Sequence, residues 1–295
     1  MLCREIYESL EPLAERVIEA RDFFGEPVRA FELGSREHPP ILLIGDIHGC
    51  IRSSEIIADA VLRFAGDAHL IVVPCLFPTI ADGLPALSKI LCGKEIHNSG
   101  EFKTLLLQEY QPVLGEKDLV VFKIGNAVLV FTNENILDRK MQGLLENFKE
   151  SLILQVSDDG SLKVLQMPNS ELFSSILGEI LGDTPKPLLS LYFTCGETDE
   201  TCFLIPEPHL TEVFELADLA ANQLAEELLC SRGPPRSTYV KRGIIKAPRT
   251  SLEEVFPQQA PSLEVRVGLK SHLEVTRAVL AVLNSAYLLH SILRS

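Results

Sequence analysis

Two side chains of the types used in metal binding and acid–base chemistry, Asp46 and His48, stand in one short turn. The turn follows the continuous apolar run Ile41–Ile44, which is typical of a buried parallel strand. It precedes a pattern that predicts a helix over residues 53–64. In open α/β sheets, ligands bind beyond the carboxyl ends of the strands. We therefore expect both side chains at the edge where a site would form.

The elements that must position this turn form one βαβ unit. A second apolar run over residues 69–75 is the next predicted strand. Strands alternate with helices along the rest of the chain, which predicts an α/β fold with a mixed, mostly parallel sheet and helices on both faces. Other elements expected from apolar spacing are helices over 3–24, 133–150 and 207–230, a hairpin over 151–166, strands over 188–194 and 201–205, and a terminal helix over 272–293.

The composition of the chain changes after residue 230. Residues 231–250 contain six lysines or arginines and no acid, which indicates a linker or surface loop. We therefore expect an α/β domain over residues 1–230. Residues 231–295 are predicted to form the basic loop, a strand and a terminal helix that pack on the same domain.

The charge and the apolar runs restrict the possible partners. A formal net charge of -14 argues against broad nucleic-acid binding, which needs a basic surface. No apolar run reaches the roughly 20 residues that a membrane span needs. The apolar helix predicted over residues 275–293 is a plausible interface for a homodimer.

The cysteines predict a reducing environment. There are seven, none in a C-x-x-C pair, and several lie in apolar runs. An odd number without a framework spacing suggests reduced thiols and a cytoplasmic protein. A bridge between Cys195 and Cys202 across a hairpin is the alternative.

The motif GDIHG at residues 45–49 resembles the opening metal motif of calcineurin-like phosphoesterases, in which an Asp and a His of one loop hold a metal. Those enzymes carry further Gly-Asp-x-x-Asp and Asn-His-Glu motifs. This chain has CLFP at residues 75–78, and Ala127 follows Gly125-Asn126. This resemblance is confined to about five residues.

A longer resemblance, over residues 27–90, is to the zinc carboxypeptidase and aspartoacylase–succinylglutamate desuccinylase superfamily. That superfamily has a Gly-Ile-His-Gly-x-Glu-Pro-Ser-Ser turn and, after the next strand, Pro-x-x-Asn-Pro-x-Gly. The corresponding segments are DIHGCIRSS at residues 46–54 and VPCLFP at residues 73–78. The resemblance implies a zinc-carboxypeptidase-like fold, His48 as first zinc ligand, and metal-dependent hydrolysis of an amide bond in a small acylated or peptide substrate.

The same resemblance assigns roles to two further acids. Glu197, in the acidic turn 195–200, would be the general base that activates a metal-bound water. Glu55 would be a substitute metal ligand beside Asp46 and His48, because the superfamily's acidic ligand falls on Ile51. An acid in a first helical turn also interacts favourably with the helix dipole, and acidic residues are common in turns. A non-catalytic relative that lost its metal site and serves as a binding or assembly module is therefore the alternative.

Overall fold

The computed structural model describes the chain except for residues 1, 46–48, 65, 67, 117–118, 133–142, 144–145, 149, 167–170, 183, 185, 197, 232–236, 248–259, 270–271 and 295. Most of the helix predicted over residues 133–150 lies outside the described residues. Among the described residues, no helix is both long and apolar enough to cross a bilayer.

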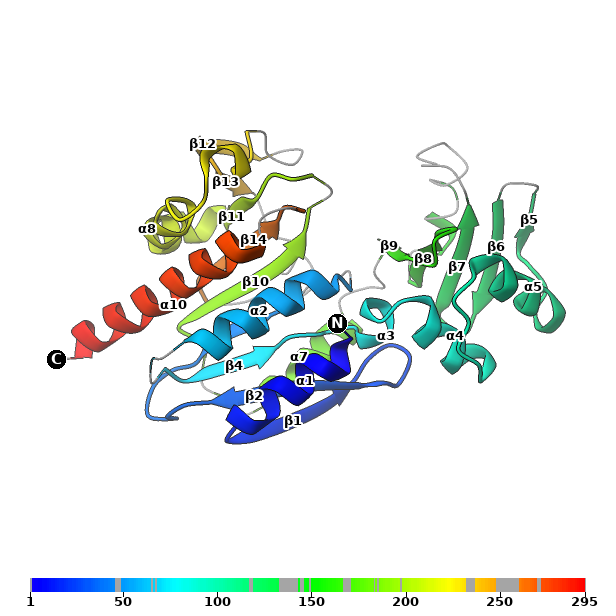
Figure 1. Cartoon of the computed structure of the whole chain (residues 1–295), viewed down its shortest axis with the longest axis horizontal. Helices are drawn as coiled ribbons and strands as arrows, with labels where there is room; N and C mark the ends of the chain where they lie inside the picture. Colours follow the sequence, from blue (N-terminus) through cyan, green and yellow to red (C-terminus); the bar gives the residue numbers. More distant parts are fainter. Residues whose placement is uncertain are drawn as a thin grey trace.

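The described strands form two sheets (Figure 1). The larger has nine strands in the order β1-β2-β4-β3-β10-β14-β11-β13-β12. Its strands are β1 (Arg16–Arg21), β2 (Pro27–Leu33), β3 (Ile41–Ile44), β4 (Leu70–Val73), β10 (Leu189–Cys195), β11 (Cys202–Pro206), β12 (Thr238–Lys241), β13 (Ile244–Ala247) and β14 (Ser262–Val267). The smaller has the order β5-β6-β7-β8-β9, with β5 (Leu114–Gly115), β6 (Leu119–Ile124), β7 (Ala127–Thr132), β8 (Leu152–Val156) and β9 (Leu162–Gln166).

The mixed α/β fold is confirmed, but the prediction of a mostly parallel sheet is wrong. Among the described strands of the larger sheet, four pairings are parallel and four antiparallel. The smaller sheet has one parallel pairing, β7 with β8, and three antiparallel pairings. Hairpins at both edges of the larger sheet, β1–β2 and β12–β13, add antiparallel pairs that the alternation of strands and helices did not reveal.

Helices cover both faces of the larger sheet. Along β3, Ile41 and Leu43 point to a core formed with α1 (Cys3–Leu10), α2 (Ile51–Arg63), α8 (Leu210–Ala221) and α10 (His272–Arg294). Leu42 and Ile44 point to a second core that includes α7 (Glu171–Leu181), α3 (Pro78–Ala81), α4 (Leu84–Cys92), α5 (Ser99–Glu109) and the smaller sheet. A strand buried on both faces needs the uninterrupted apolar run seen in ILLI.

The prediction of one helix over residues 3–24 is wrong. The chain forms α1 over Cys3–Leu10, a 3₁₀ turn over Glu11–Leu13, and then β1. Pro12 explains the end of α1, because proline cannot donate the backbone hydrogen bond that a helix interior requires. The apolar residues after it pair with β2 as an antiparallel edge strand.

Two predictions near the carboxyl-terminal end are also corrected. The helix predicted over 207–230 divides into a 3₁₀ turn over Glu207–His209, α8, and a second 3₁₀ turn over Glu226–Leu228. The predicted basic loop 231–250 contains the strands β12 and β13.

β14 belongs to the larger sheet, and α10 belongs to the helical layer on that sheet. A domain division at residue 230 stays a prediction.

The terminal helix α10 lies against α2 and α8 (Figure 1). Its apolar residues Val275, Ala278, Val279, Val282 and Leu283 are buried by this packing. This part of the predicted dimer interface is therefore already covered by the chain itself. A homodimer through α10 stays a prediction.

A buried ionic group joins β2 to the start of β4. The side chains of Glu32 and His69 are 6% and 2% exposed, and His69 Nε2 lies 2.9 Å from Glu32 Oε1. The other ring nitrogen, Nδ1, lies 2.8 Å from the carbonyl oxygen of His38. A protonated imidazole can donate to both acceptors. Arg36 also contacts the second oxygen of Glu32, at 2.5 Å.

Candidate functional site

The candidate site lies at the carboxyl ends of β3 and β10, which are parallel neighbours. A disulfide joins Cys50 to Cys195 there, with a Cα–Cα distance of 6.1 Å. Cys50 is the N-cap of α2, and Cys195 is the last residue of β10. The turn after β3 and the turn after β10 are therefore joined covalently at one edge of the sheet.

The expectation of reduced thiols throughout is wrong in this structure. Besides Cys50–Cys195, a second disulfide joins Cys202 to Cys230. The alternative bridge between Cys195 and Cys202 is also wrong, because β14 lies between β10 and β11 and these strands form no hairpin. Cys3, Cys75 and Cys92 are free. A hydrogen bond with the Cys75 thiol, together with burial, strongly raises the pKa of Cys3. A cytoplasmic location stays a prediction.

Three of the four predicted site residues, Asp46, His48 and Glu197, lie outside the described residues. Their chain neighbours are described. His48 precedes Cys50 by two residues, and Glu197 follows Cys195 by two residues. The disulfide thus joins the two segments that carry all three predicted residues.

The fourth predicted residue, Glu55, is half-buried on α2, and because this helix begins at Ile51 its first turn contains no acid, so the first-turn interpretation of Glu55 is wrong. It interacts with Arg52, as does Asp199 of the turn that follows β10. Burial lowers the pKa of the Arg52 guanidinium, while the negative charges of Glu55 and Asp199 act in the opposite direction. Arg52 therefore forms an electrostatic link between α2 and the 195–200 turn, and Glu55 takes part in that link.

The described residues alone do not complete a metal site. Among them, no three His, Cys, Asp or Glu side chains are grouped so that they could hold a metal ion. The sulfur atoms of Cys50 and Cys195 are joined to each other, so neither is a thiolate ligand. A zinc site needs about three protein ligands. At least one of Asp46, His48 and Glu197 would therefore have to contribute.

A buried carboxylate in the middle of β14, the strand next to β10, was not anticipated from the sequence. Glu264 of β14 is fully buried and accepts hydrogen bonds from Thr194 Oγ1 at 3.0 Å and from Arg266 at 3.2 Å. The alternation in SLEVRV was a usable signal, since it places Glu264 and Arg266 on one face of β14 and Leu263 on the other. A central strand with two charged residues on one face indicates a polar environment there.

The turn after β3 is also fixed by its glycine. Gly49 has a φ of +76°, which L-residues rarely adopt. A Cβ atom at this position would lie 2.4 Å from Cγ2 of Ile80 in α3. The glycine therefore lets α3 pack directly against the turn.

Replacing Gly49 with alanine should lower the free energy of unfolding by about 1–3 kcal/mol, through backbone strain and the clash with Ile80. Gly93→Ala is the matched control. Gly93 also has a positive φ, of +70°, but nothing lies within 4 Å of the added Cβ. Chemical denaturation of both variants measures the difference. Equal losses would show that Ile80 does not restrict the turn.

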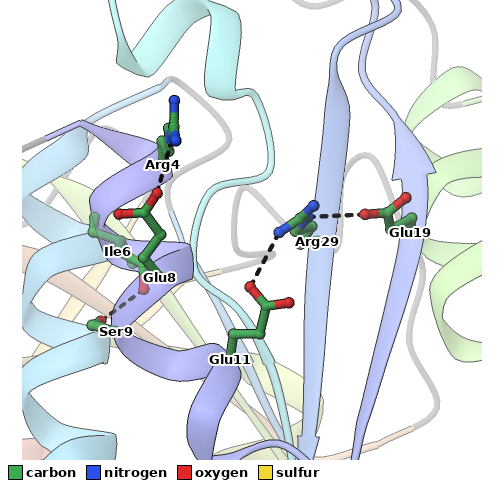
Figure 2. Close-up of polar contacts among 7 residues, drawn as sticks. All are labelled: Arg4, Ile6, Glu8, Ser9, Glu11, Glu19 and Arg29. Atoms are coloured by element: carbon green, nitrogen blue, oxygen red, sulfur yellow. Dashed lines mark hydrogen bonds and ion pairs between the residues drawn. The ribbon is translucent and has the colours of Figure 1, made fainter.

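Two adjoining cavities, of about 430 and 560 Å³, lie away from the disulfide, along α1, α3 and α4. The arginines and the lysine that line them are each paired with an acid. Arg4 contacts Glu8 at 2.8 Å, and Arg29 contacts Glu19 at 2.9 Å and Glu11 at 3.5 Å (Figure 2). Lys89 contacts Glu95 at 2.8 Å. The Arg29–Glu11 pair joins the 3₁₀ turn after α1 to the β1–β2 hairpin, and each of these three cations already has an acidic partner.

Comparisons with known proteins identify a fold and no family. No family model and no curated protein matches the sequence. A solved structure titled "putative carboxypeptidase", from Burkholderia mallei, is 12% identical with a TM-score of 0.50, covering 97% of this chain and 68% of its own. A "putative metallopeptidase" from Shewanella denitrificans is 14% identical with a TM-score of 0.48, covering 98% and 90%. A metallo-carboxypeptidase from Pseudomonas aeruginosa is 11% identical with a TM-score of 0.48, covering 97% and 68%. The chain has a carboxypeptidase-like fold.

Proposed function

We propose that this protein is a divergent hydrolase that cleaves an amide bond in a small acylated or peptide substrate. One observation supports the proposal above all. The Cys50–Cys195 disulfide joins the turn that carries Asp46 and His48 to the turn that carries Glu197. The described residues next to these predicted ones, Cys50 and Cys195, meet at the carboxyl edge of β3 and β10, which supports the proposal that they share one chemistry. The carboxypeptidase-like fold is consistent with a site there.

Each predicted residue has a role in this proposal. Asp46 and His48 are the proposed zinc ligands, with Glu55 as the third. Zinc at such a site would polarise the amide carbonyl. Glu197 is the proposed general base, which takes a proton from the attacking water. Glu55 already interacts with Arg52, so zinc binding in this proposal depends mainly on Asp46 and His48.

The test measures bound metal and hydrolysis in the same preparations. The purified full chain is analysed for zinc and is assayed against N-acyl amino acids and dipeptides for release of a free amine. We expect about one zinc per chain, lost in His48→Ala, and a fall in kcat of about 10²–10⁴-fold in Glu197→Gln. His209→Ala and Glu215→Gln, on α8 and the turn before it, are matched controls and should change neither quantity. Hydrolysis that survives both His48→Ala and Glu197→Gln would contradict the proposed roles.

A non-catalytic binding or assembly module is the second candidate, and one observation favours it. Ile51 stands where the resemblance expects an acidic ligand, and it packs against the core below α2. A chain without metal and without hydrolysis in any preparation would support this candidate. No observation favours the calcineurin-like alternative at the position of its second motif. Cys75 and Phe77 stand there, and both are buried at 1% exposure.

A further inference from the structure

The two cavities along α1, α3 and α4 adjoin each other, because four residues line both of them. The shared residues are Arg4, Glu26, Pro78 and Asp82. The volumes, about 430 and 560 Å³, each lie within the range of about 300–1,000 Å³ that is typical of small-molecule sites. A small organic ligand therefore has room in this part of the molecule.

Apolar side chains form much of the larger cavity. Its apolar lining residues are Leu2, Pro78, Pro85, Ala86 and Ile90. Leu2 is 52% exposed, so a ligand placed against it would remove apolar surface from water. Burial of apolar surface favours binding, and this part of the cavity suits an aliphatic stem.

Every arginine and lysine of the lining is already paired with an acid. The charged residues of the lining are Arg4, Arg29 and Lys89, together with Glu8, Glu11, Glu26, Asp82 and Glu95. The pairs are Arg4 with Glu8, Arg29 with Glu11 and Lys89 with Glu95, and Figure 2 shows the first two. Two carboxylates of the lining, Glu26 and Asp82, form no ion pair within the described part of the chain, although Glu26 and Lys89 interact more weakly.

These two carboxylates are the acids that line both cavities. Asp82 is half-buried and accepts a hydrogen bond from the backbone N–H of Cys3 at 2.8 Å. Burial raises the pKa of the Asp82 carboxyl, while hydrogen bonds from Cys3 and the positive charge of the chain's amino terminus act in the opposite direction. Because burial disfavours the charged form, a further cation beside Asp82 would stabilise it. Glu26 is exposed, directly before β2.

We propose that these adjoining cavities bind an organic cation with a primary ammonium group on an aliphatic stem, held by Asp82 and Glu26. The stem lies against the apolar lining around Pro78, and a diamine places one ammonium group at each carboxylate. A free amine and the lysine side chain of a peptide share this chemistry. The site lies away from the Cys50–Cys195 disulfide, and the inference does not depend on the proposed hydrolase function.

The experiment titrates the full chain with amines in a calorimeter. The probes are a five-carbon diamine, the diol of the same length, and lysine blocked at both its amino and carboxyl groups. We expect the diamine to bind at least about 10-fold more tightly than the diol, because only the diamine carries positive charge. At about 1 M salt, where the Debye length is about 3 Å, this advantage should shrink.

The blocked lysine identifies the source of the cation. Tighter binding of the free diamine assigns the site to small amines, whereas tighter binding of the blocked lysine assigns it to a peptide side chain.

Variants locate the amine. Asp82→Asn should weaken diamine binding by about 10-fold, and Glu26→Gln by about 3-fold, because Glu26 is exposed and its ion pair would be screened by water. The amide oxygen in Asp82→Asn can still accept the hydrogen bond from Cys3, so α1 keeps this contact. Glu215→Gln is the matched control. It removes one exposed carboxylate on α8, away from both cavities, and should bind the diamine as the parent does.

Two results would overturn the inference. One is diamine binding no tighter than that of the diol. The other is equal diamine binding by the parent, Glu26→Gln and Glu215→Gln, which would place the amine elsewhere on an acidic surface. Should Asp82→Asn fail to fold, Glu26→Gln and the comparison of diamine with diol still decide the question. Amide hydrolysis does not enter this measurement, so its failure would leave the proposed hydrolase intact.

Discussion

Loss of the Cys50–Cys195 disulfide, through paired Cys50→Ser and Cys195→Ser substitutions, is expected to lower the free energy of unfolding by about 5 kcal/mol at most. The bond closes a loop with a sequence separation of 145 residues and so removes much conformational freedom from the unfolded chain. Guanidinium denaturation without reductant measures the change. The result is meaningful because the two residues lie at element ends, where serine fits without a large cavity.

The buried disulfide provides the comparison. Cys202–Cys230 closes a loop with a separation of only 28 residues, so its removal should cost less, about 3–4 kcal/mol. In strongly reducing buffer the parent protein should approach the stability of the Cys50→Ser, Cys195→Ser variant first, because Cys50 and Cys195 are half-buried whereas Cys202 and Cys230 are buried. A larger loss from the shorter loop would show that chain entropy does not govern the effect.

Replacing His69 with alanine is expected to lower the free energy of unfolding by about 3–5 kcal/mol. The substitution removes the buried partner of the Glu32 carboxylate, which keeps its contact with the exposed Arg36, and the His38 carbonyl loses a donor. Removing the buried partner of a buried charge is costly, whereas removing an exposed partner costs little. Arg36→Ala, whose side chain is 54% exposed, should therefore cost less than about 1 kcal/mol.

A double variant separates the charge interaction between Glu32 and His69 from the loss of side-chain packing. Chemical denaturation should show that Glu32→Gln combined with His69→Ala is less destabilised than the sum of the two single variants, because the neutral amide needs no counter-charge. Strict additivity would mean that the two side chains do not stabilise each other. A loss in His69→Ala no larger than that in Arg36→Ala would contradict the expected cost of the buried charge.

The part of the fold that the sequence predicted well is the βαβ unit around the candidate site. The runs ILLI at 41–44 and LIVV at 70–73 are buried on both faces, and the helix between them begins within two residues of its predicted start. Local signals sufficed because continuous apolar runs, turn glycines and helical spacing all act over a few residues.

Other elements depend on partners that are distant in the chain. Val17 and Ile18 fit a helical pattern, yet they belong to a strand because β2 is there to pair with them. The strands β10 and β11 look like a hairpin around an acidic turn, but β14 separates them. No local pattern encodes which strand inserts between two others, so the mixed direction of the sheet was beyond sequence reasoning.

The candidate site shows the same division. The sequence indicated the turn at Asp46 and His48 and the turn at Glu197 as separate features. The parallel pairing of β3 with β10 brings their described neighbours together, since it joins Cys50 to Cys195 across 145 residues. Glu264 was missed because the sequence analysis singled out no residue of this strand. Its burial became visible only when β14 was placed in the centre of the sheet.

The central place of β14 has a consequence for synthesis on the ribosome. A chain is made from its amino-terminal end, so β10 and β11 emerge well before Ser262–Val267, the segment that pairs with both of them. Until that segment arrives, each of the two earlier strands has an open edge with free backbone donors and acceptors. The nascent protein therefore carries its aggregation-prone edges in the middle of the future sheet. Completion of the sheet, and with it the covering of α2 by α10, must wait for the last tenth or so of the chain.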